Sequence, residues 1–501
     1  MEKFREKLGK LMCQKRVMRG FLTSLVIILS LQIPWMKAIK NESGDSIEGH
    51  ITNEEINIIQ IQLNQTFGGL ERDFGSSVIQ TVDGGFLIAG STDSYSSKEN
   101  LDMWLVKTNT SGYVEWNQTY DLSLYDLVSD LIQTIDQNFL LIGSCFDGCA
   151  PCLDWGSALK LFANGTVEWC QFYQYGERGG AWVDSDEHCL VHAVVQTTDG
   201  GFLFAGETVD YLVGDTGPNN MDMWLVKTDD NGSVEWNQIY GSRDDGGYSV
   251  IQTTDEGFLI AGVTIDYHYV VDNDSRVFIY PHNADMWLVK LYANGSVEWD
   301  QAYGGTGSDY AFNVIQTVDG GFLLAGVTNY WSNNSDMWLV KTDANGSEEW
   351  DQTYGGSGHD HASSVLQTAD GGFLIVGDTE SYGAGEEDIW LVKTYSNGTI
   401  KWNQTFGGSE RDRGKSVIQT ADSEFLVVGS TESFGAGDSD IWLLKLSESI
   451  ETTTELMSKT SPTSTVPTNP SESKDSSILG FEIFSLFVGL LLIVIIQKQR
   501  K

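Results

Sequence analysis

The sequence predicts an all-β fold: a seven-bladed β-propeller of four-stranded antiparallel blades, accompanied by a single C-terminal transmembrane helix. One segment recurs seven times, and most copies consist of short β-branched and aromatic runs separated by Asp-Gly or Asn-Gly turn signals. A strand that the last copy lacks stands ahead of the first copy. Together these observations predict a closed ring of blades.

Two sequence columns establish the number of copies. The hexapeptide Asp-Met-Trp-Leu-Val-Lys at 102–107 recurs in close variants as far as 440–445, with a degenerate copy at 154–160. A glutamine stands at the same position of every copy: Gln80, Gln133, Gln196, Gln252, Gln316, Gln367 and Gln419. The repeats start near residues 77, 130, 193, 249, 313, 364 and 416 and place the propeller at 58–446.

Each copy is predicted to form four strands. In the first copy, strand A (77–81) joins strand B (85–90) through an Asp-Gly-Gly turn, and a loop of variable length leads to strand C (102–108). A second tight turn leads to strand D (114–120). Tight Gly-containing turns between apolar runs favour hairpins. Strands C and D each carry a tryptophan in most copies, which we expect to pack between neighbouring blades.

The last copy has no strand D of its own. It ends after strand C at Lys445, whereas residues 58–69 near the start of the chain match the end of strand D. We therefore expect the N-terminal strand to complete the last blade and close the ring, since closure leaves no unpaired edge.

Both termini carry targeting signals. Residues 1–38 combine a basic start with an apolar run, which predicts a secretory signal peptide, with an uncleaved anchor as the alternative. Residues 447–476, rich in Ser, Thr and Pro, predict an extended stalk, and 477–496 predict a transmembrane helix. The basic segment 497–501 then lies in the cytoplasm, and the protein is a single-pass cell-surface protein with an extracellular propeller.

The chain carries 30 Lys and Arg against 70 Asp and Glu, a formal net charge of −40. This charge repels phosphate backbones and excludes nucleic acid as a partner. Because many of the acids occupy repeat columns, the acidity indicates the copying of one blade rather than a cationic partner.

The blade topology predicts two faces of different character. The A–B and C–D turns lie on one face, which we call the turn face, and the B–C and D–A loops lie on the other, the loop face. Variable loops on a repeated scaffold favour a binding function for the loop face. Its candidate residues are aromatics (Tyr95, Tyr211, Tyr267, Tyr330, Trp331, Tyr382 and Phe434) and an aspartate column (Asp73, Asp126, Asp245, Asp309, Asp360 and Asp412). The alternative is structural: the rings pack between blades and the aspartates cap turns.

The C–D turns carry glycosylation sequons at Asn109, Asn164, Asn231, Asn294, Asn345 and Asn397. The alternative is that Asn-Gly is a favourable turn and that Ser or Thr follows by repeat inheritance. We expect the asparagines to be exposed on the turn face.

Cysteines cluster around the second blade: Cys145, Cys149, Cys152, Cys170 and Cys189. Outside the cell they predict two disulfides and one remaining thiol. The alternative is a zinc site formed by Cys149, Cys152, Cys189 and His192. Calcium is a further alternative, because Asp272-Asn-Asp274 and the turn that starts at Asp229 resemble calcium loops without the spacing of an EF-hand.

The C–D unit, as in 339–350, resembles the tryptophan-docking repeat of pyrroloquinoline-quinone-type propellers, since both place Gly four residues before the Trp. The region 58–446 resembles quinoprotein-like and kelch-like propellers of secreted surface proteins. The C-terminal segment that begins at Gly480 is similar to archaeal sorting signals. The resemblance implies the scaffold; adjacent cysteines are absent, and we expect no bound cofactor.

No hydrolase, zinc-protease or phosphate-loop motif is present. We therefore expect a non-catalytic cell-surface propeller that binds a glycan, protein or cation-bridged ligand on its loop face. The alternative is an extracellular enzyme that acts on carbohydrates or alcohols, a glycosidase or a quinoprotein-like dehydrogenase. A purely structural surface-layer component is a third interpretation.

Overall fold

A computed structural model describes residues 55–96, 100–146, 155–174, 187–210, 220–241, 244–271, 277–332 and 334–452. The predicted signal peptide and transmembrane helix lie outside these residues, as do the C-terminal tail and most of the stalk. Within the described part of the chain, no helix is long and apolar enough to cross a membrane.

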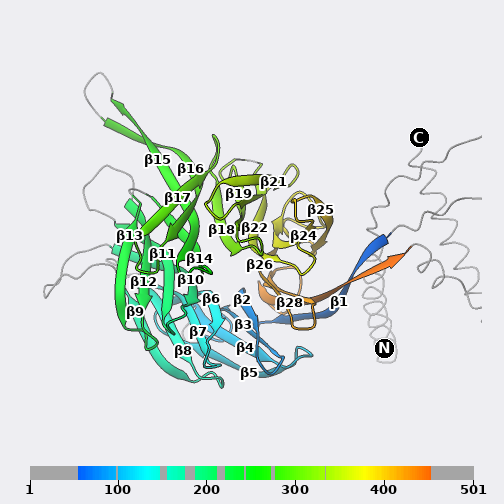
Figure 1. Cartoon of the computed structure of the whole chain (residues 1–501). Coiled ribbons are helices and arrows are strands. Elements are labelled where there is room, and N and C mark those ends of the chain that lie inside the picture. The colour runs from blue at the N-terminus through cyan, green and yellow to red at the C-terminus, as the bar shows by residue number, and fades with distance from the viewer. Residues whose placement is uncertain are drawn as a thin grey trace, which may run out of the picture. The chain divides into compact units, whose positions relative to one another are not determined.

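The described residues form seven antiparallel four-stranded sheets (Figure 1). Blade I holds β2 (Asp73–Gln80), β3 (Phe86–Thr92), β4 (Asp102–Thr108) and β5 (Val114–Tyr120). Blade II holds β6 (Tyr125–Gln133), β7 (Phe139–Phe146), β8 (Trp155–Leu161) and β9 (Val167–Tyr173). Blade III holds β10 (Glu187–Gln196), β11 (Phe202–Asp210), β12 (Asn220–Thr228) and β13 (Val234–Tyr240). Blade IV holds β14 (Gly246–Gln252), β15 (Phe258–Val271), β16 (Val277–Leu291) and β17 (Val297–Tyr303).

The remaining three blades repeat the order. Blade V holds β18 (Tyr310–Gln316), β19 (Phe322–Thr328), β20 (Asp336–Thr342) and β21 (Glu348–Tyr354). Blade VI holds β22 (Asp360–Gln367), β23 (Phe373–Thr379), β24 (Asp388–Thr394) and β25 (Ile400–Phe406). Blade VII holds β26 (Asp412–Gln419), β27 (Phe425–Thr431), β28 (Asp440–Thr452) and β1 (Glu55–Phe67), in the sheet order β1-β28-β27-β26. The seven-bladed fold and its closure by the N-terminal strand are therefore confirmed.

The core lies between adjacent blades. Strands B and C are buried along their whole length in most blades, which is why they read as continuous apolar runs, whereas strand D is mostly exposed. One core cluster joins Leu323 and Leu339 of blade V to Phe373 and Trp390 of blade VI. The strand-C tryptophan thus packs against the preceding blade, as the sequence predicts.

The first and last blades meet through both backbone and core. The Asp73 backbone N–H donates to the Ser439 carbonyl at 2.7 Å. Phe67 and Val78 share a core cluster with Leu426. Blade VII therefore seals the ring against blade I.

The glutamine column joins neighbouring blades across the turn face. Each Gln amide donates to a carbonyl of its own A–B turn, as Gln80 Nε2 does to the Gly84 oxygen. In five copies the Gln Oε1 also accepts a backbone N–H from the A–B turn of the preceding blade. These pairs are Ile135–Gln196, Thr198–Gln252, Thr254–Gln316, Val318–Gln367 and Ala421–Gln80.

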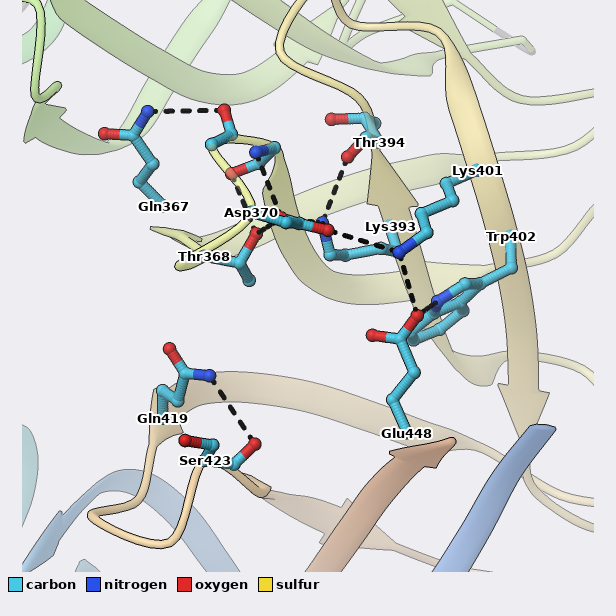
Figure 2. A network of polar contacts seen from close by, with 12 residues as sticks. Gln367, Thr368, Asp370, Lys393, Thr394, Lys401, Trp402, Gln419, Ser423 and Glu448 are labelled. Atoms are coloured by element: carbon cyan, nitrogen blue, oxygen red, sulfur yellow. Dashed lines mark hydrogen bonds and ion pairs between the residues drawn. The ribbon is translucent and has the colours of Figure 1, made fainter. Parts of the chain in front are cut away.

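A lysine braces each blade at the same face; it is buried in blades I to VI and partly buried in blade VII, and Figure 2 shows the one in blade VI. Lys393 Nζ donates to Asp370 Oδ1 at 2.9 Å and to the Thr394 carbonyl at 3.1 Å. Asp370 also accepts hydrogen bonds from Thr368 and Gly372. Burial raises the pKa of Asp370, but these hydrogen bonds outweigh it and hold the pKa well below the usual value.

The two terminal strands extend past the turn face as a ribbon (Figure 1). Leu446 occupies the register position at which strand C of other blades ends, yet β28 continues to Thr452, which pairs with Glu55. The structure therefore places 447–452 in a strand, whereas the sequence assigned these residues to the stalk. Lys401 and Trp402 of blade VI both donate to Glu448 Oε1, which fixes the ribbon to the ring.

Candidate ligand-binding site

The aspartate column lies inside the scaffold. All six carboxylates are buried. Asp412 is representative: it accepts hydrogen bonds from the Thr431 hydroxyl, from Ser433 Oγ at 2.7 Å and from the Gly408 N–H at 2.8 Å. Asp73 and Asp360 repeat the pattern with their own Thr, Ser and Gly partners. This geometry favours the turn-capping interpretation of the column.

Three of the candidate aromatics pack on the strand-C tryptophans. The ring of Tyr95 lies 5.0 Å from that of Trp104, and Tyr382 and Phe434 take the same position at 5.2 Å from their own tryptophans. The Tyr95 and Tyr382 hydroxyls donate to the Gly68 and Gly355 carbonyls. Tyr211 lies outside the described residues, and Tyr267 is placed only as part of strand β15.

Tyr330 and Trp331 depart from this pattern. Trp331 is 76% exposed, and its ring meets the edge of Tyr330 at 4.7 Å. Tyr330 in turn contacts Tyr310 at 5.1 Å and His361 at 5.4 Å, both on first strands of blades. Of the aromatics that the sequence singles out, the structure joins these two to a cluster near the centre of the ring.

The first strands of neighbouring blades contact one another around the ring, so they form its innermost layer. Their loop-face ends carry residues that vary around the ring. The position after the aspartate column holds Phe74, Leu127, Leu190, Gly246, Tyr310, His361 and Arg413, with Cys189 replacing the aspartate in blade III. Two positions further on stand Ser76, Ser129, His192, Tyr248, Phe312, Ser363 and Lys415. We call these two sets the inner band.

Blades III to VI give the inner band an aromatic side. The ring of Tyr248 lies 5.1 Å from His192 and 5.8 Å from Phe312, and Phe312 stacks near Tyr310 at 6.2 Å. Burial, followed by the nearby Glu207 carboxylate, raises the pKa of Tyr248 well above its ordinary value. Tyr248 therefore keeps its proton at neutral pH and offers a hydroxyl rather than a charge.

Blade VII gives the opposite side a cationic character. A cavity of about 180 Å³ is lined by Phe74, Ser76, Arg411, Arg413, Lys415 and Glu432, together with small residues. Arg413 Nη2 donates to Glu387 Oε1 at 3.0 Å, and Arg411 Nε lies 3.0 Å from Glu386 Oε2. The inner band therefore changes from cations to aromatics across blade VI.

His361 stands at this change of character. Its Nε2 lies 3.0 Å from Ser335 Oγ, which also contacts His359 Nδ1 at 2.9 Å, and its Nδ1 lies 3.6 Å from Asp378 Oδ2. Burial, reinforced by His359, lowers the pKa of His361 to about 4, whereas burial raises the pKa of Asp378 to about 6.

The connectivity Ser335–His361–Asp378 resembles that of a serine-hydrolase triad. Ser335 is fully buried, however, so its hydroxyl is closed to a substrate, and the 3.6 Å separation between His361 and Asp378 exceeds a hydrogen bond. The group therefore supports the position of the His361 ring rather than providing a nucleophile.

Among the described residues, one group of side chains could hold a metal ion: Asp102, Asp121 and Asp126, whose carboxylate oxygens lie within 4.8 Å of one another. Acidic groups often lie this close without an ion, so their proximity alone assigns no calcium site. The sequence offered two calcium candidates. In the first of them, Asp229 Oδ1 accepts hydrogen bonds from the backbone N–H groups of Asn231 and Ser233, as in an ordinary turn. Asp272 to Asp274 lie outside the described residues.

The described cysteines are not bridged to one another. Cys145 and Cys170 are free thiols in one core cluster, and Cys189 is buried in the next. Cys149 and Cys152 lie outside the described residues, so the disulfide prediction stays untested for them. Cys189 packs in the core between blades II and III, whereas His192 contacts Tyr248 in the inner band. The structure does not bring these two zinc candidates together.

The sequon asparagines all lie in the C–D turns of the turn face. Five are exposed, and Asn109 is half-buried. In Asn164, Asn294 and Asn397 the side-chain Oδ1 accepts the hydroxyl of the following Ser or Thr at 2.7 Å. This turn geometry is compatible with both interpretations of the sequons.

No family model and no curated protein matches this chain. Among solved structures, the PQQ-bound aldose sugar dehydrogenase of Streptomyces coelicolor is 10% identical, with coverage of 79% of this chain and 100% of that chain and a TM-score of 0.35. Sqt1 of Chaetomium thermophilum is also 10% identical, with coverage of 77% and 98% and a TM-score of 0.42. A protein of unknown function from Dyadobacter fermentans is 11% identical, with coverage of 77% and 98% and a TM-score of 0.40. These likenesses are low, and the fold assignment rests on the strand topology above.

Sequence reasoning missed most of the inner band. The signal that identifies it is present in the repeats: once the copies are aligned on the aspartate column, the next residue is of six types in seven blades, and only Leu127 and Leu190 are alike. The loops attract attention by their length, but the positions with the greatest chemical variety lie on the strands.

Proposed function

We propose that this chain is a non-catalytic cell-surface protein whose propeller binds a glycan, protein or cation-bridged ligand at the loop-face end of the inner band. The observation that carries the proposal is the chemical variety of the inner band on an otherwise repeated ring. The glutamine column holds the same residue in all seven blades, whereas the two inner-band positions hold six and five different residue types. Positions freed from the repeat are where a recognition surface is built.

Among these ligand classes, the aromatic side favours a saccharide. Trp331 is 76% exposed and is held against Tyr330, which itself rests on the inner band. An exposed ring with fixed neighbours offers an apolar platform for a sugar face, while nearby hydroxyl and charged groups can bind its hydroxyls.

The ribbon supports an outward orientation of this site. Strands β1 and β28 leave the ring at the turn face, and the chain continues from Thr452 toward the predicted stalk and membrane helix. The turn face would then face the cell, and the loop face with the inner band would face the surroundings.

The proposal can be tested with the detergent-solubilised full-length protein on a glycan array, with and without calcium. We expect binding that is lost in Trp331→Ala and retained in Tyr113→Ala. Tyr113 is a matched control because it is 70% exposed but lies in a C–D turn of the opposite face.

Three outcomes would overturn the glycan-binding function that the aromatic side favours: no binding under either condition, equal loss of binding in both variants, or turnover of a bound saccharide. Binding that requires calcium would assign the cation-bridged form of the ligand. Binding that persists in a chelator would assign a direct contact.

A further inference from the structure

This inference rests on the proposed function above. If the loop face binds a saccharide, the cationic side of the inner band indicates which class of saccharide it binds. Three cations, Arg411, Arg413 and Lys415, line one cavity of about 180 Å³. The chain as a whole has 30 basic residues against 70 acidic ones. Glu432 is the one acidic side chain in the cavity wall. This concentration of positive charge is opposite to the character of the molecule.

Lys415 differs from the two arginines, which form ion pairs with Glu386 and Glu387. No hydrogen bond or ion pair joins its ammonium group to another described residue. The lysines of the turn face differ, since Lys393 for example is buried and bonded to Asp370. Burial sets the direction in which the pKa values of His361 and Asp378 shift, and the charge of the nearby Lys415 is a smaller influence that lowers both. An ammonium group at the edge of a cavity has three donors available for a ligand anion.

The two arginines retain donors as well. Arg413 uses Nε and Nη2 on Glu387, and Arg411 uses Nε on Glu386. A guanidinium carries five N–H donors, so each arginine keeps some for a ligand. The Arg413 and Arg411 side chains are 45% and 49% exposed, so a ligand anion can reach their remaining N–H groups.

The remaining wall suits a sugar ring. Phe74 supplies an apolar surface, and Ser76, Ser430 and Ser439 supply hydroxyl groups. The cavity is smaller than the roughly 300–1,000 Å³ typical of pockets for drug-sized ligands. It therefore accepts one residue of a chain rather than a large compact ligand. From Lys415 the surface continues through His361 to Tyr330 and Trp331.

We infer that the ligand is an acidic oligosaccharide: one sugar places its carboxylate or sulfate against Lys415, Arg411 and Arg413, and a neighbouring sugar stacks on Trp331. A cation–anion contact with an aromatic platform beside it fixes both the charge and the direction of the saccharide chain.

The affinity of the detergent-solubilised full-length protein is measured by titration calorimetry with trigalacturonate, with its fully methyl-esterified neutral form, and with a sulfated galactan oligosaccharide. We expect the anionic ligands to bind at least about tenfold more tightly than the ester. Whether carboxylate or sulfate is preferred distinguishes the two sources of anionic charge. High salt should weaken anion binding.

The charge of Lys415 is tested by a matched pair of variants. Lys415→Met removes the charge and keeps the length of the stem, and we expect about tenfold or greater weakening for the acidic ligands with no change for the ester. Lys415→Arg should restore most of the affinity. The thermal unfolding midpoint should be the same in both variants, since no described residue bonds to Lys415.

The outcomes separate this inference from the proposed function. Equal binding of acid and ester that depends on Trp331 but not on Lys415 would overturn the acidic specificity and leave the glycan-binding function standing. Absence of binding to every saccharide would overturn both. Loss of acid binding in Lys415→Met with recovery in Lys415→Arg supports the inference.

Discussion

The turn face and the loop-face end of the inner band are built from the same seven repeats, yet they use their side chains in opposite ways. On the turn face, Gln80 and its equivalents join blade to blade, and each buried lysine bonds within its own blade. At the inner band, equivalent positions hold residues as different as Arg413, His361 and Tyr310. A repeated residue on a ring makes the same contact each time, whereas a varied one leaves the scaffold unaffected and is available for a ligand.

The difference shows that a ring protein can separate stability from recognition by position along one strand. Strand A of blade VI carries the inner-band residue His361 near its start and ends with Gln367, which joins it to the preceding blade. Changes at the first position should alter binding, and changes at the last should alter folding.

Removal of strand β1 should have the largest effect. Deletion of residues 55–67 removes the outer strand of blade VII, exposes the edge of β28 and takes Phe67 from the core between blades VII and I. We expect loss of the cooperative thermal transition, followed by circular dichroism, together with aggregation. A synthetic peptide of residues 55–67 should restore the transition. If the deletion variant already unfolds cooperatively without the peptide, closure of the ring by β1 is dispensable.

Asp378, which lies beside the inner-band residue His361, should lower the stability of the protein at neutral pH. Because its pKa in the folded protein, about 6, exceeds the ordinary 3.8, its contribution is fully present below about pH 4 and is lost as the pH rises through 6. At about 1.4 kcal/mol per pH unit, this corresponds to roughly 3 kcal/mol at most. Asp378→Asn should therefore raise the unfolding free energy at pH 7 and flatten its change between pH 4 and 6, as measured by urea denaturation.

The turn-face aspartates should respond in the opposite sense. Burial opposes their ionisation, but hydrogen bonds from Thr81, Lys107 and Gly85 lower the pKa of Asp83 to about 2. Its stabilising contribution is present above about pH 4 and is lost as the pH falls through 2. In Asp83→Asn the loss of stability below pH 4 should be smaller than in the parent protein; an unchanged acid profile would contradict this role.

Two adjacent glycines offer a finer test of the loop-face scaffold. A Cβ atom at Gly304 would lie 2.0 Å from Asp285 Oδ1 and 2.9 Å from Asp309 Oδ2, whereas a Cβ at Gly305 meets nothing within 4 Å. Gly304→Ala should therefore lower the unfolding free energy by about 1–3 kcal/mol, and Gly305→Ala should leave it nearly unchanged. Equal effects would show that the loop yields and that the aspartate pair is not a rigid contact.

The smallest expected effect concerns a single glutamine contact. Gln80→Ala removes the bond from the Ala421 N–H as well as the bond to Gly84, and should cost about 1 kcal/mol. Gln133 is the matched control, because within the described part of the chain its side chain bonds to Gln137 in its own turn and not to a neighbouring blade. A smaller loss in Gln133→Ala, measured by urea denaturation, would assign the difference to the contact between blades.

The fold was accessible from the sequence because its determinants are local. The turn signals, the strand-C hexapeptide and the displaced strand at 58–69 specify seven blades and their closure. The candidate site was only partly accessible. Tyr330 and Trp331 were identified as aromatic residues at the start of a B–C loop. Tyr95 and Tyr382 occupy the same place in their own loops, but their rings pack on tryptophans. Sequence pattern alone does not show whether a ring points into the scaffold or away from it.

The sequence by itself determined the repeat, the order of the strands, and which blade takes its fourth strand from the N-terminal part of the chain. Only the tertiary structure decided which residues meet. Ala421 donates to Gln80 across 341 residues of chain, and Lys415, His361 and Trp331 form one surface although three different blades supply them. Strand formation and turns depend on neighbours in sequence, whereas a contact between blades depends on the ring having closed, and no local pattern records that geometry.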